Sequence, residues 1–361
     1  MPNKQRGHGG RVTLGDIAAD VDLSAAAVSM ALRGNSRVSA ETQKRVTEAA
    51  ERLGYVYDRG AAKLRTGQSD TIGIIVGDIS NAFFGELVAG VDAAIAPAGK
   101  ISFLLNARED VDRQSQLLNR LREHGVDGII LCPAPETDEA TIEEIRHWGI
   151  PIVQMLRTVA DTSGDWVSAD YKTGVEALCE HLVRRGHRRI ALIGGELEHS
   201  ATWQRHTGYR AALKRNGIEA DLIYRCPLTR RAGRHAIGEL LTSETPPTAA
   251  VCYNDVVAFG VIAGLRENGI EPGKDFAVTG FDNVEEAAES WPPLTTVATH
   301  AREIGDAAGQ LLLRRINEPD ASREQIIVPT RLIVRQSCGA AAETPQTKHN
   351  QKLENAAPRS A

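Results

Sequence analysis

Apolar residues recur every three or four positions between Val12 and Leu53 and divide this stretch into three short segments. The recurring apolar positions are Leu14, Ile17, Ala18 and Val21, then Val28 and Leu32, then Val46, Ala49, Ala50 and Leu53. Because this spacing follows the period of an α-helix, it predicts three amphipathic helices. Thr13, Ser24 and Ser39 precede the three segments and are typical N-cap residues. Only residues 22–23 separate the first two segments, so the stretch reads as a helix-turn-helix.

From Thr71 onward the pattern changes to unbroken apolar runs that alternate with amphipathic segments. An unbroken apolar run is typical of a parallel strand covered on both faces. Strands are expected at 71–76, 101–106, 128–132, 152–155, 166–169, 189–195, 249–253 and 276–281, and helices at 85–96, 114–124, 171–185, 205–216 and 255–268. This alternation, repeated twice, predicts an α/β core of two doubly wound parallel sheets. The late segments 293–297, 304–316 and 326–334 are expected to cross back between the two halves.

The second predicted helix carries small and hydroxyl side chains on its outer side. Val28 and Leu32 must face the core, which leaves Ser24, Ala25, Ala26, Ser29, Met30 and Arg33 on the outer side or at its edge. Small residues let a helix N-terminus approach a duplex closely, and hydroxyl and free N–H groups suit phosphate oxygens. An ordinary small helical bundle would show the same pattern, so both interpretations stay open at this point.

The segments TLGDIA, LSAAAVSMAL, RVSAETQKRV, LGY and DRGAAKLRTGQS resemble the LacI/GalR family of bacterial transcription regulators, and the resemblance continues to about Gly339. It implies an all-α helix-turn-helix DNA-binding head followed by a periplasmic-binding-protein-like core. The expected domains are a disordered arm at 1–11, the head at 12–57, a hinge at 58–69, the core at 70–339 and a disordered tail at 340–361. Within the core, one subdomain is expected at about 70–169 and 300–328, and the other at about 170–297 and 330–339.

The resemblance also assigns DNA contacts. It implies that the hinge becomes helical on the operator and that Leu64, flanked by Lys63 and Arg65, enters the minor groove from both subunits of a dimer. A solvated linker is the alternative interpretation of this segment. Phosphate contacts are expected from Thr13, Ser24, Ser29, Ser39 and Thr42, base contacts from Ala25, Ala26, Met30 and Arg37, and further contacts from Leu14, Arg33, Arg59 and Ala61. Gly60 departs from the family pattern and should leave the free hinge less ordered.

Polar and aromatic residues follow several predicted strands, where a ligand of such a fold binds. The candidate effector-binding residues are Asp78, Asn81, Phe83, Phe84, Arg157, Asp170, Trp203, Arg205, Asn254 and Asp282. Each could instead be a loop residue or a helix cap, and Trp203 could pack against the protein beside the start of a helix. Arg205, Asn254 and Asp282 resemble common effector contacts of the family. Arginine with several carboxylates and amides favours a sugar or sugar derivative over a purine corepressor, whereas the direction of the response stays open.

Composition and charge limit the remaining possibilities. The net charge is −5, but residues 1–67 carry an excess of four positive charges and the rest an excess of nine negative charges, as expected if only the head meets DNA. No apolar run approaches the roughly 18 residues of a membrane span and no signal peptide is seen, which predicts a cytoplasmic protein that joins the nucleoid when bound to DNA. A solute-binding transport protein would share the core but would have no use for the head.

No chemistry beyond binding is expected. The five cysteines are scattered and never form a CxxC pair, so neither a disulfide framework nor a metal site is predicted. No catalytic triad, HExxH motif or phosphate-binding loop is present, so we predict neither catalysis nor a cofactor. The expected partners are a second copy of the chain, a pseudo-palindromic operator in double-stranded DNA and a small-molecule effector.

Overall fold

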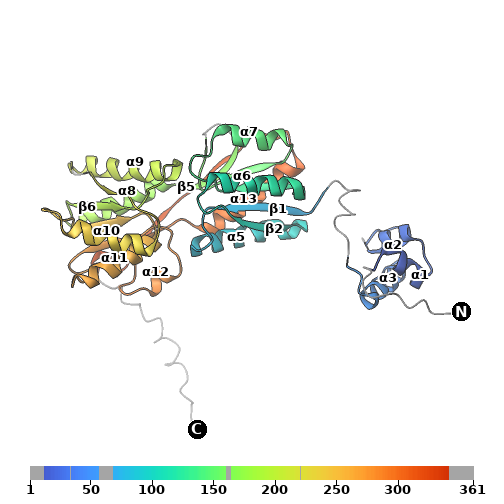
Figure 1. Cartoon of the computed structure of the whole chain (residues 1–361). Helices are drawn as coiled ribbons and strands as arrows, with labels where there is room; N and C mark the ends of the chain where they lie inside the picture. Colours follow the sequence, from blue (N-terminus) through green and yellow to red (C-terminus); the bar gives the residue numbers. More distant parts are fainter. Residues whose placement is uncertain (1–11, 33, 57–67, 160–163, 220, 341–361) are drawn as a thin grey trace, which may run out of the picture. The chain divides into compact units, whose positions relative to one another are not determined.

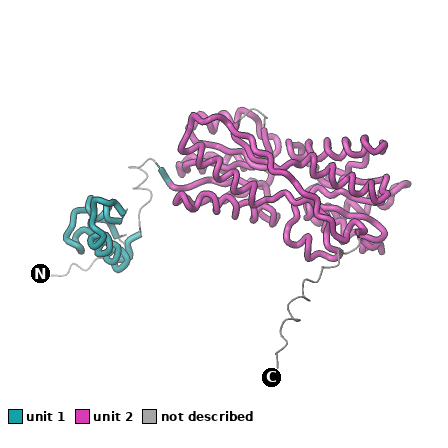
Figure 2. Tube along the Cα trace, turned by 180° about the vertical axis from the view of Figure 1, so that it is seen from behind, with its two compact units in different colours: residues 1–69 teal, residues 70–361 magenta. Residues whose placement is uncertain are grey.

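The computed structural model describes residues 12–32, 34–56, 68–159, 164–219 and 221–340. The chain divides after Ser69 into two compact units (Figure 2). The predicted arm at 1–11, most of the predicted hinge and all but the first residue of the predicted tail lie outside the described residues. Among the described residues, no helix is long and apolar enough to cross a membrane.

The first unit contains the three predicted helices, α1 (Leu14–Val21), α2 (Ala25–Leu32) and α3 (Ala40–Leu53). Ile17, Val28 and Val46, one from each helix, are fully buried and form the centre of a small core. Thr13 and Asp16 form the capping box at the start of α1, where each side chain bonds the other residue's backbone N–H. The Arg45 guanidinium donates to the carbonyl of Val21 over 3.1 Å and so ties α3 to the end of α1.

The first lobe of the core unit is built on a six-stranded parallel sheet. Its strands are β1 (Thr71–Val76), β2 (Ile101–Asn106), β3 (Gly128–Leu131), β4 (Ile152–Met155), β5 (Asp165–Ala169) and β11 (Gln325–Val328), in the order β11-β5-β4-β3-β1-β2. One face is covered by α5 (Ala82–Ile95) and α13 (Ala301–Asn317), and the other by α6 (Val111–His124) and α7 (Glu139–His147) (Figure 1).

The second lobe repeats this plan with four parallel strands. They are β6 (Ile190–Ile193), β7 (Leu222–Tyr224), β8 (Ala249–Cys252) and β9 (Ala277–Thr279), in the order β7-β6-β8-β9. Helices α8 (Tyr171–Arg184) and α9 (Ser200–Arg215) pack on one face, while α10 (Arg230–Leu241) and α11 (Asp255–Glu267) pack on the other. The short α12 (Glu286–Glu289) follows β9. The prediction of two doubly wound parallel sheets is confirmed.

The chain crosses between the lobes three times: from β5 to α8, from β10 (Thr296–Ala298) to α13, and from β11 to β12 (Arg331–Ile333). β10 and β12 pair antiparallel to each other at these crossings. The late segments cross as expected, except that 304–316 lies within α13 of the first lobe. Helix α9 begins at Ser200, five residues before the predicted start, because the imidazole of His199 accepts from the N–H of Thr202 and caps the helix there.

Candidate functional site

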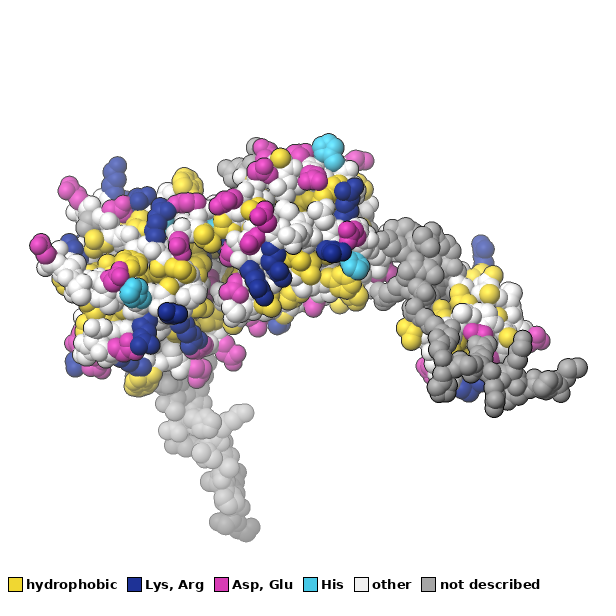
Figure 3. Space-filling model, viewed as in Figure 1, with side chains coloured by type: hydrophobic (Ala, Val, Ile, Leu, Met, Phe, Trp, Pro, Cys, Tyr) yellow, Lys and Arg dark blue, Asp and Glu magenta, His cyan; other side chains and the backbone are white. Residues whose placement is uncertain are grey.

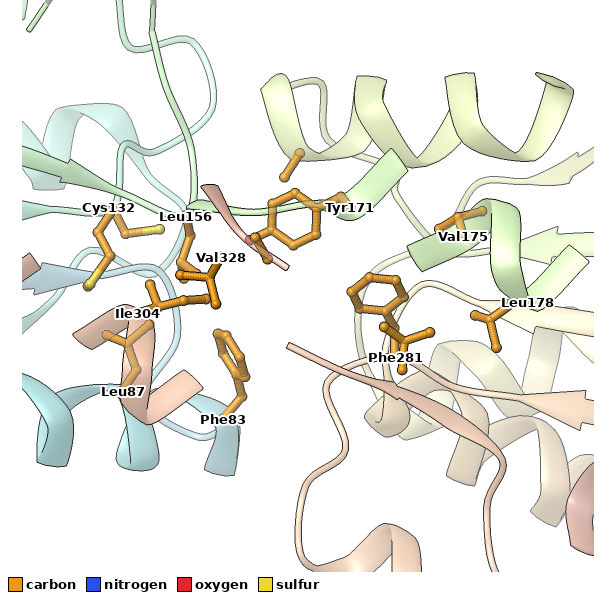
Figure 4. Close-up of a cluster of buried hydrophobic side chains, with 14 of the residues drawn as sticks. Phe83, Leu87, Cys132, Leu156, Tyr171, Val175, Leu178, Phe281, Ile304 and Val328 are labelled. Carbon is orange, nitrogen blue, oxygen red and sulfur yellow. The ribbon is translucent and has the colours of Figure 1, made fainter. Parts of the chain in front are cut away.

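A cavity of about 260 Å³ lies between the lobes, where the strands of both sheets end. Figure 4 shows Phe83 and Leu156 of the first lobe opposite Tyr171 and Phe281 of the second. Eight of the ten residues predicted to bind an effector line this cavity: Asp78, Asn81, Phe83, Phe84, Arg157, Arg205, Asn254 and Asp282. The structure therefore brings together side chains that lie up to 204 positions apart in the chain.

Two predicted effector residues lie elsewhere. The Asp170 carboxylate accepts from the backbone N–H of Thr173 over 3.0 Å and is the N-cap of α8. The sequence left this helix-capping role open, and Asp170 does not line the cavity. Trp203 lies on the outer side of α9 with 66% of its surface exposed, so it neither lines the cavity nor packs in the core.

Asn81 and Asn254 cap a helix and line the cavity at the same time. The Asn81 carboxamide oxygen accepts from the N–H of Phe83 over 3.1 Å, and that of Asn254 accepts from the N–H of Val257 over 3.0 Å. Each side chain still has an NH₂ group that donates to no other described residue. The two interpretations that the sequence left open for these residues are therefore compatible with each other.

Arg157, which follows β4, is held by an ion pair within the first lobe. Its guanidinium donates through both terminal nitrogens to the two carboxylate oxygens of Glu109, with a distance of 2.9 Å from Nη2 to Oε1. Nη1 also donates to the carbonyl of Pro133 over 3.2 Å. Only 8% of Arg157 is exposed, whereas Glu109 is half-buried. A bidentate contact of this kind fixes the plane of the guanidinium.

Arg205 on α9 is held by aromatic rings instead. Its guanidinium carbon lies 4.0, 4.1 and 4.6 Å from the ring centroids of Tyr171, Tyr253 and Phe281. These distances are typical of cation–π contacts. Nη1 donates to the carbonyl of Ala201 over 3.3 Å, whereas the buried Nε has no hydrogen-bond partner among the described residues. Because α9 starts early, Arg205 lies in its second turn rather than opening the helix.

The carboxyl group of Asp282 lies in a poorly solvated environment. Burial and the nearby Asp255 raise the pKa of Asp282 well above its ordinary value, and the guanidinium of Arg205 offsets this only in part. No hydrogen bond from another described residue reaches its carboxyl oxygens. Asp282 therefore resembles Arg205 in having hydrogen-bonding capacity that the protein itself does not use.

Asp255 has a structural role behind the cavity. Its fully buried carboxylate accepts from the Thr296 hydroxyl over 2.6 Å and from the N–H of Val284 over 2.9 Å, which ties the start of α11 to β10. Burial raises the pKa of Asp255 to about 7, although these hydrogen bonds act in the opposite direction.

Several cavity residues were not predicted from the sequence. The polar ones with a defined role are Glu109, Tyr171, His199, Thr202 and Tyr253. Thr202 and Tyr253 share a hydrogen bond of 3.2 Å that fixes one of the rings against Arg205. Burial, with Arg157 and Arg205 nearby, lowers the pKa of His199 to about 2, so its imidazole is neutral. Tyr253 directly follows β8, and its strand-end position could have identified it.

The first unit exposes part of the predicted DNA-binding surface. Ser24, Ala25 and Ala26 at the start of α2 are exposed, as are Thr13, Arg37 and Ser39, while Leu14, Met30 and Thr42 are half-buried. Ser29 was expected on the outer side of α2 or at its edge, but it is buried with only 5% of its surface exposed. Arg33, Arg59, Ala61 and Leu64 lie outside the described residues.

Among the described residues, no group of three or more His, Cys, Asp and Glu side chains could hold a metal ion. All five cysteines are free and buried. Burial raises the pKa of Cys132, at the cavity, to about 11, so its thiol is protonated and a weak nucleophile at neutral pH.

Comparisons with known proteins match both units. Residues 13–58 match the family described as bacterial regulatory proteins, lacI family, and residues 69–336 match periplasmic binding proteins and sugar binding domain of LacI family. The maltose regulon regulatory protein MalI of Escherichia coli (strain K12) is 31% identical over 334 residues, covering 90% of this chain and 98% of MalI.

Two solved structures extend the comparison. The lac repressor dimer bound to operator and the anti-inducer ONPF has a TM-score of 0.83 and 26% identity, covering 92% of this chain and 100% of that chain. The transcriptional regulator CelR in complex with cellobiose has a TM-score of 0.69 and 28% identity, covering 91% and 100%.

Proposed function

Because the chain belongs to the LacI family of bacterial transcription regulators, we propose that it binds a pseudo-palindromic operator as a dimer and that a sugar in the cavity changes its affinity for this DNA. The observation that carries the proposal is the cavity of the core, which presents unpaired polar groups of Arg205 and Asp282 beside aromatic rings.

The head supplies the operator contacts in this proposal. The exposed start of α2 allows Ala25 and Ala26 to approach base edges, where they can make only apolar contacts such as those with a thymine methyl. Ser24, whose hydroxyl oxygen caps α2 by accepting from the N–H of Ala27 over 3.1 Å, lies where a phosphate would meet the helix N-terminus. Arg37 is exposed and supplies the polar base contact. Leu64 remains the proposed minor-groove contact.

A second copy of the chain is the proposed cover for the edge strand β2. Its side chains Ile101, Phe103 and Leu104 are each at least 40% exposed, and Figure 3 shows hydrophobic atoms gathered over this edge of the first lobe. An uncovered apolar edge strand is a liability in a monomer, and a two-fold axis beside it would bury the same residues from both subunits.

A sugar fits the cavity because hydroxyl groups can both donate and accept. Arg205 and the NH₂ groups of Asn81 and Asn254 would donate to sugar oxygens, and the carboxyl oxygens of Asp282 would accept from sugar hydroxyls. Phe83, Tyr171 and Tyr253 offer apolar ring surface for the C–H faces of a sugar. The cellobiose bound by CelR, a structural relative, supports this choice over a purine.

The test has one arm for DNA and one for the ligand. Selection from random palindromic duplexes, followed by fluorescence anisotropy at two salt concentrations, should recover a pseudo-palindrome bound with steep salt dependence. Leu64→Ala should lose operator-specific affinity and keep weak nonspecific binding, with Leu353→Ala in the tail as the matched control. Unchanged operator affinity in Leu64→Ala would contradict the minor-groove assignment.

The ligand arm measures thermal stability and operator affinity in the presence of mono- and disaccharides, with purines and nucleosides as comparison compounds. A sugar that stabilises the protein and changes operator affinity supports the proposal. If a purine stabilises the protein and changes its operator affinity while no sugar does so, the effector is a purine and not a sugar. Sequence-blind DNA binding under all conditions would overturn the operator-binding part.

A further inference from the structure

The ion pair between Arg157 and Glu109 is assembled from the ends of four neighbouring strands. Glu109 follows β2, Arg157 follows β4, and the carbonyl of Pro133, which accepts from Arg157, follows β3. The backbone N–H of Glu109 donates to the carbonyl of Gly77 at the end of β1 over 3.2 Å. Contacts from this many elements fix the two side chains in one geometry.

The backbone around Glu109 is specialised for this contact. Arg108 and Glu109 have φ angles of 58° and 56°, in the left-handed region that side chains with a Cβ rarely adopt. At Gly77, an added Cβ would lie 2.2 Å from the Oε1 atom of Glu109, so a side chain at this position would displace the carboxylate from its contact with Arg157. Such backbone strain persists where the surrounding structure fixes it, and it is common at ligand sites.

Carboxyl groups outnumber guanidinium groups among the described residues that line the cavity. The described lining contains two arginines, Arg157 and Arg205, and four carboxylates, which belong to Asp78, Glu109, Glu196 and Asp282. Arg157 is already neutralised by Glu109, and Arg205 lies next to Asp282. Even with Asp282 protonated, three carboxylates face two guanidinium groups, so a phosphate or carboxylate that enters the cavity would meet a net negative charge.

We infer that Glu109 is a specificity-determining residue that occupies Arg157 and thereby restricts the cavity to uncharged sugars, excluding sugar phosphates and sugar acids. The inference rests on the proposed function, since it names the charge class of the sugar. An anion could use Arg157 only by displacing Glu109, which would leave a half-buried carboxylate without its partner. Exclusion of the wrong ligand by an unpaired charge is a common source of specificity.

The first test uses inorganic phosphate alone, so it does not depend on knowing the sugar. Thermal unfolding and isothermal titration calorimetry are carried out on the full chain with increasing phosphate, at constant ionic strength and pH 7. Glu109→Gln keeps the size of the side chain but frees donors of Arg157. We expect a saturable increase in Tm with phosphate for this variant that the wild type lacks, and its loss in Glu109→Gln/Arg157→Gln.

The matched control is Glu123→Gln, which removes the same charge from an exposed ion pair with Arg120 on α6 of the same lobe. It should behave like the wild type, and any phosphate bound by the head will affect all variants equally. If Glu109→Gln does not fold, Glu109→Ala takes its place. A wild type that binds phosphate through Arg157, or a folded Glu109 variant that gains no phosphate binding, would overturn the inference.

The second test compares matched sugars, such as glucose, glucose 6-phosphate and glucuronate, or cellobiose and its phosphate, including whichever sugar the ligand screen identifies. The wild type should prefer the neutral member of a pair by on the order of 100-fold, because the anion leaves a charge unpaired. Glu109→Gln should reduce this preference to less than about tenfold, since Arg157 can then bind the anion.

The experiments distinguish a failure of the sugar assignment from a failure of the role proposed for Glu109. If no sugar binds but Glu109→Gln gains phosphate binding, the sugar assignment fails, whereas the conclusion that Glu109 prevents Arg157 from binding anions stands. If a neutral sugar binds and its phosphate binds the wild type equally well, the sugar assignment stands and the role of Glu109 fails.

Discussion

Each lobe directs one arginine to the cavity, and the two side chains have opposite surroundings. Arg157 of the first lobe donates to both oxygens of Glu109 and to the carbonyl of Pro133. Arg205 of the second lobe lies among three aromatic rings, and its buried Nε has no partner among the described residues. The arginine of the first lobe is therefore satisfied within the protein, whereas the second lobe has unused donors on Arg205 and an unused acceptor on Asp282. Because leaving buried polar groups unpaired is costly, the second lobe should gain most from a ligand.

The sharpest test of this asymmetry is Arg205→Ala. We expect the affinity for the sugar found by the ligand screen to fall by about 100-fold or more, since the change removes charged hydrogen bonds and a cation that orders three rings. Isothermal titration calorimetry measures the affinity. Arg215→Ala is the matched control, because Arg215 lies on the same helix in an exposed ion pair with Glu176 and Glu180. Wild-type affinity in a folded Arg205→Ala protein would show that the second lobe does not supply the main contacts with the sugar.

Residues at the strand ends of both lobes could be predicted from the sequence, whereas the contacts of Arg157 and Arg205 could not. Asn254 and Asp282 follow apolar runs, so their positions in a parallel sheet could be inferred from the chain alone. The contact of Glu109 with Arg157 spans 48 positions and depends on left-handed backbone at Glu109 and on the missing Cβ of Gly77. No pattern of residues around either position in the sequence indicates this contact.

The rings around Arg205 were missed for a different reason. Tyr171, Tyr253 and Phe281 begin or follow buried segments, and their sequence pattern is the same as that of core residues. At the level of the fold, the strands with unbroken apolar runs were predicted. β7, α7, α10 and the short α12 were not predicted. β7 has only three half-buried residues, and α10 contains four basic side chains within its first six positions.

Asp282→Asn separates ligand binding from stability. The substitution should weaken sugar binding about tenfold, because the amide NH₂ replaces a carboxyl oxygen that would accept from a sugar hydroxyl. The same change should make the unliganded protein more stable at pH 7, since burial raises the pKa of Asp282 and thus disfavours the ionised form in the folded state. Calorimetric titration and chemical unfolding give the two quantities.

The pH dependence of this stability gain has a defined sign. Above about pH 4 the unfolded chain loses the Asp282 proton while the folded protein retains it, so wild-type stability falls as pH rises toward the folded pKa. The advantage of Asp282→Asn should therefore be small near pH 4 and increase with pH. Asp255, whose pKa is about 7, is present in both proteins. Asp320→Asn, at an exposed position, is the control. A stability difference that does not change with pH would exclude a desolvated carboxyl as its cause.

The smallest expected effect concerns a contact that joins the two lobes without touching the cavity. The backbone N–H of Thr158, after β4, donates to the hydroxyl oxygen of Ser200, at the start of α9, over 2.9 Å. Neither residue lines the cavity. Ser200→Ala removes the acceptor and should change sugar affinity by roughly three- to fivefold, the usual value of one neutral hydrogen bond. Ser243→Ala, where the hydroxyl bonds only within its own lobe, should have no effect.

The direction of the Ser200→Ala effect identifies the arrangement of the lobes that the sugar prefers. A ligand can shift an equilibrium only toward the state that it binds more tightly. Weaker binding in Ser200→Ala would mean that the sugar selects the arrangement in which Thr158 and Ser200 are bonded, and tighter binding would mean that it selects another. Operator affinity of the unliganded variant, measured by anisotropy, then shows whether DNA prefers the same arrangement as the sugar. If both prefer the bonded arrangement, the sugar is a corepressor, and if they differ, it is an inducer. Unchanged affinity for both ligands would show that this bond does not distinguish the states.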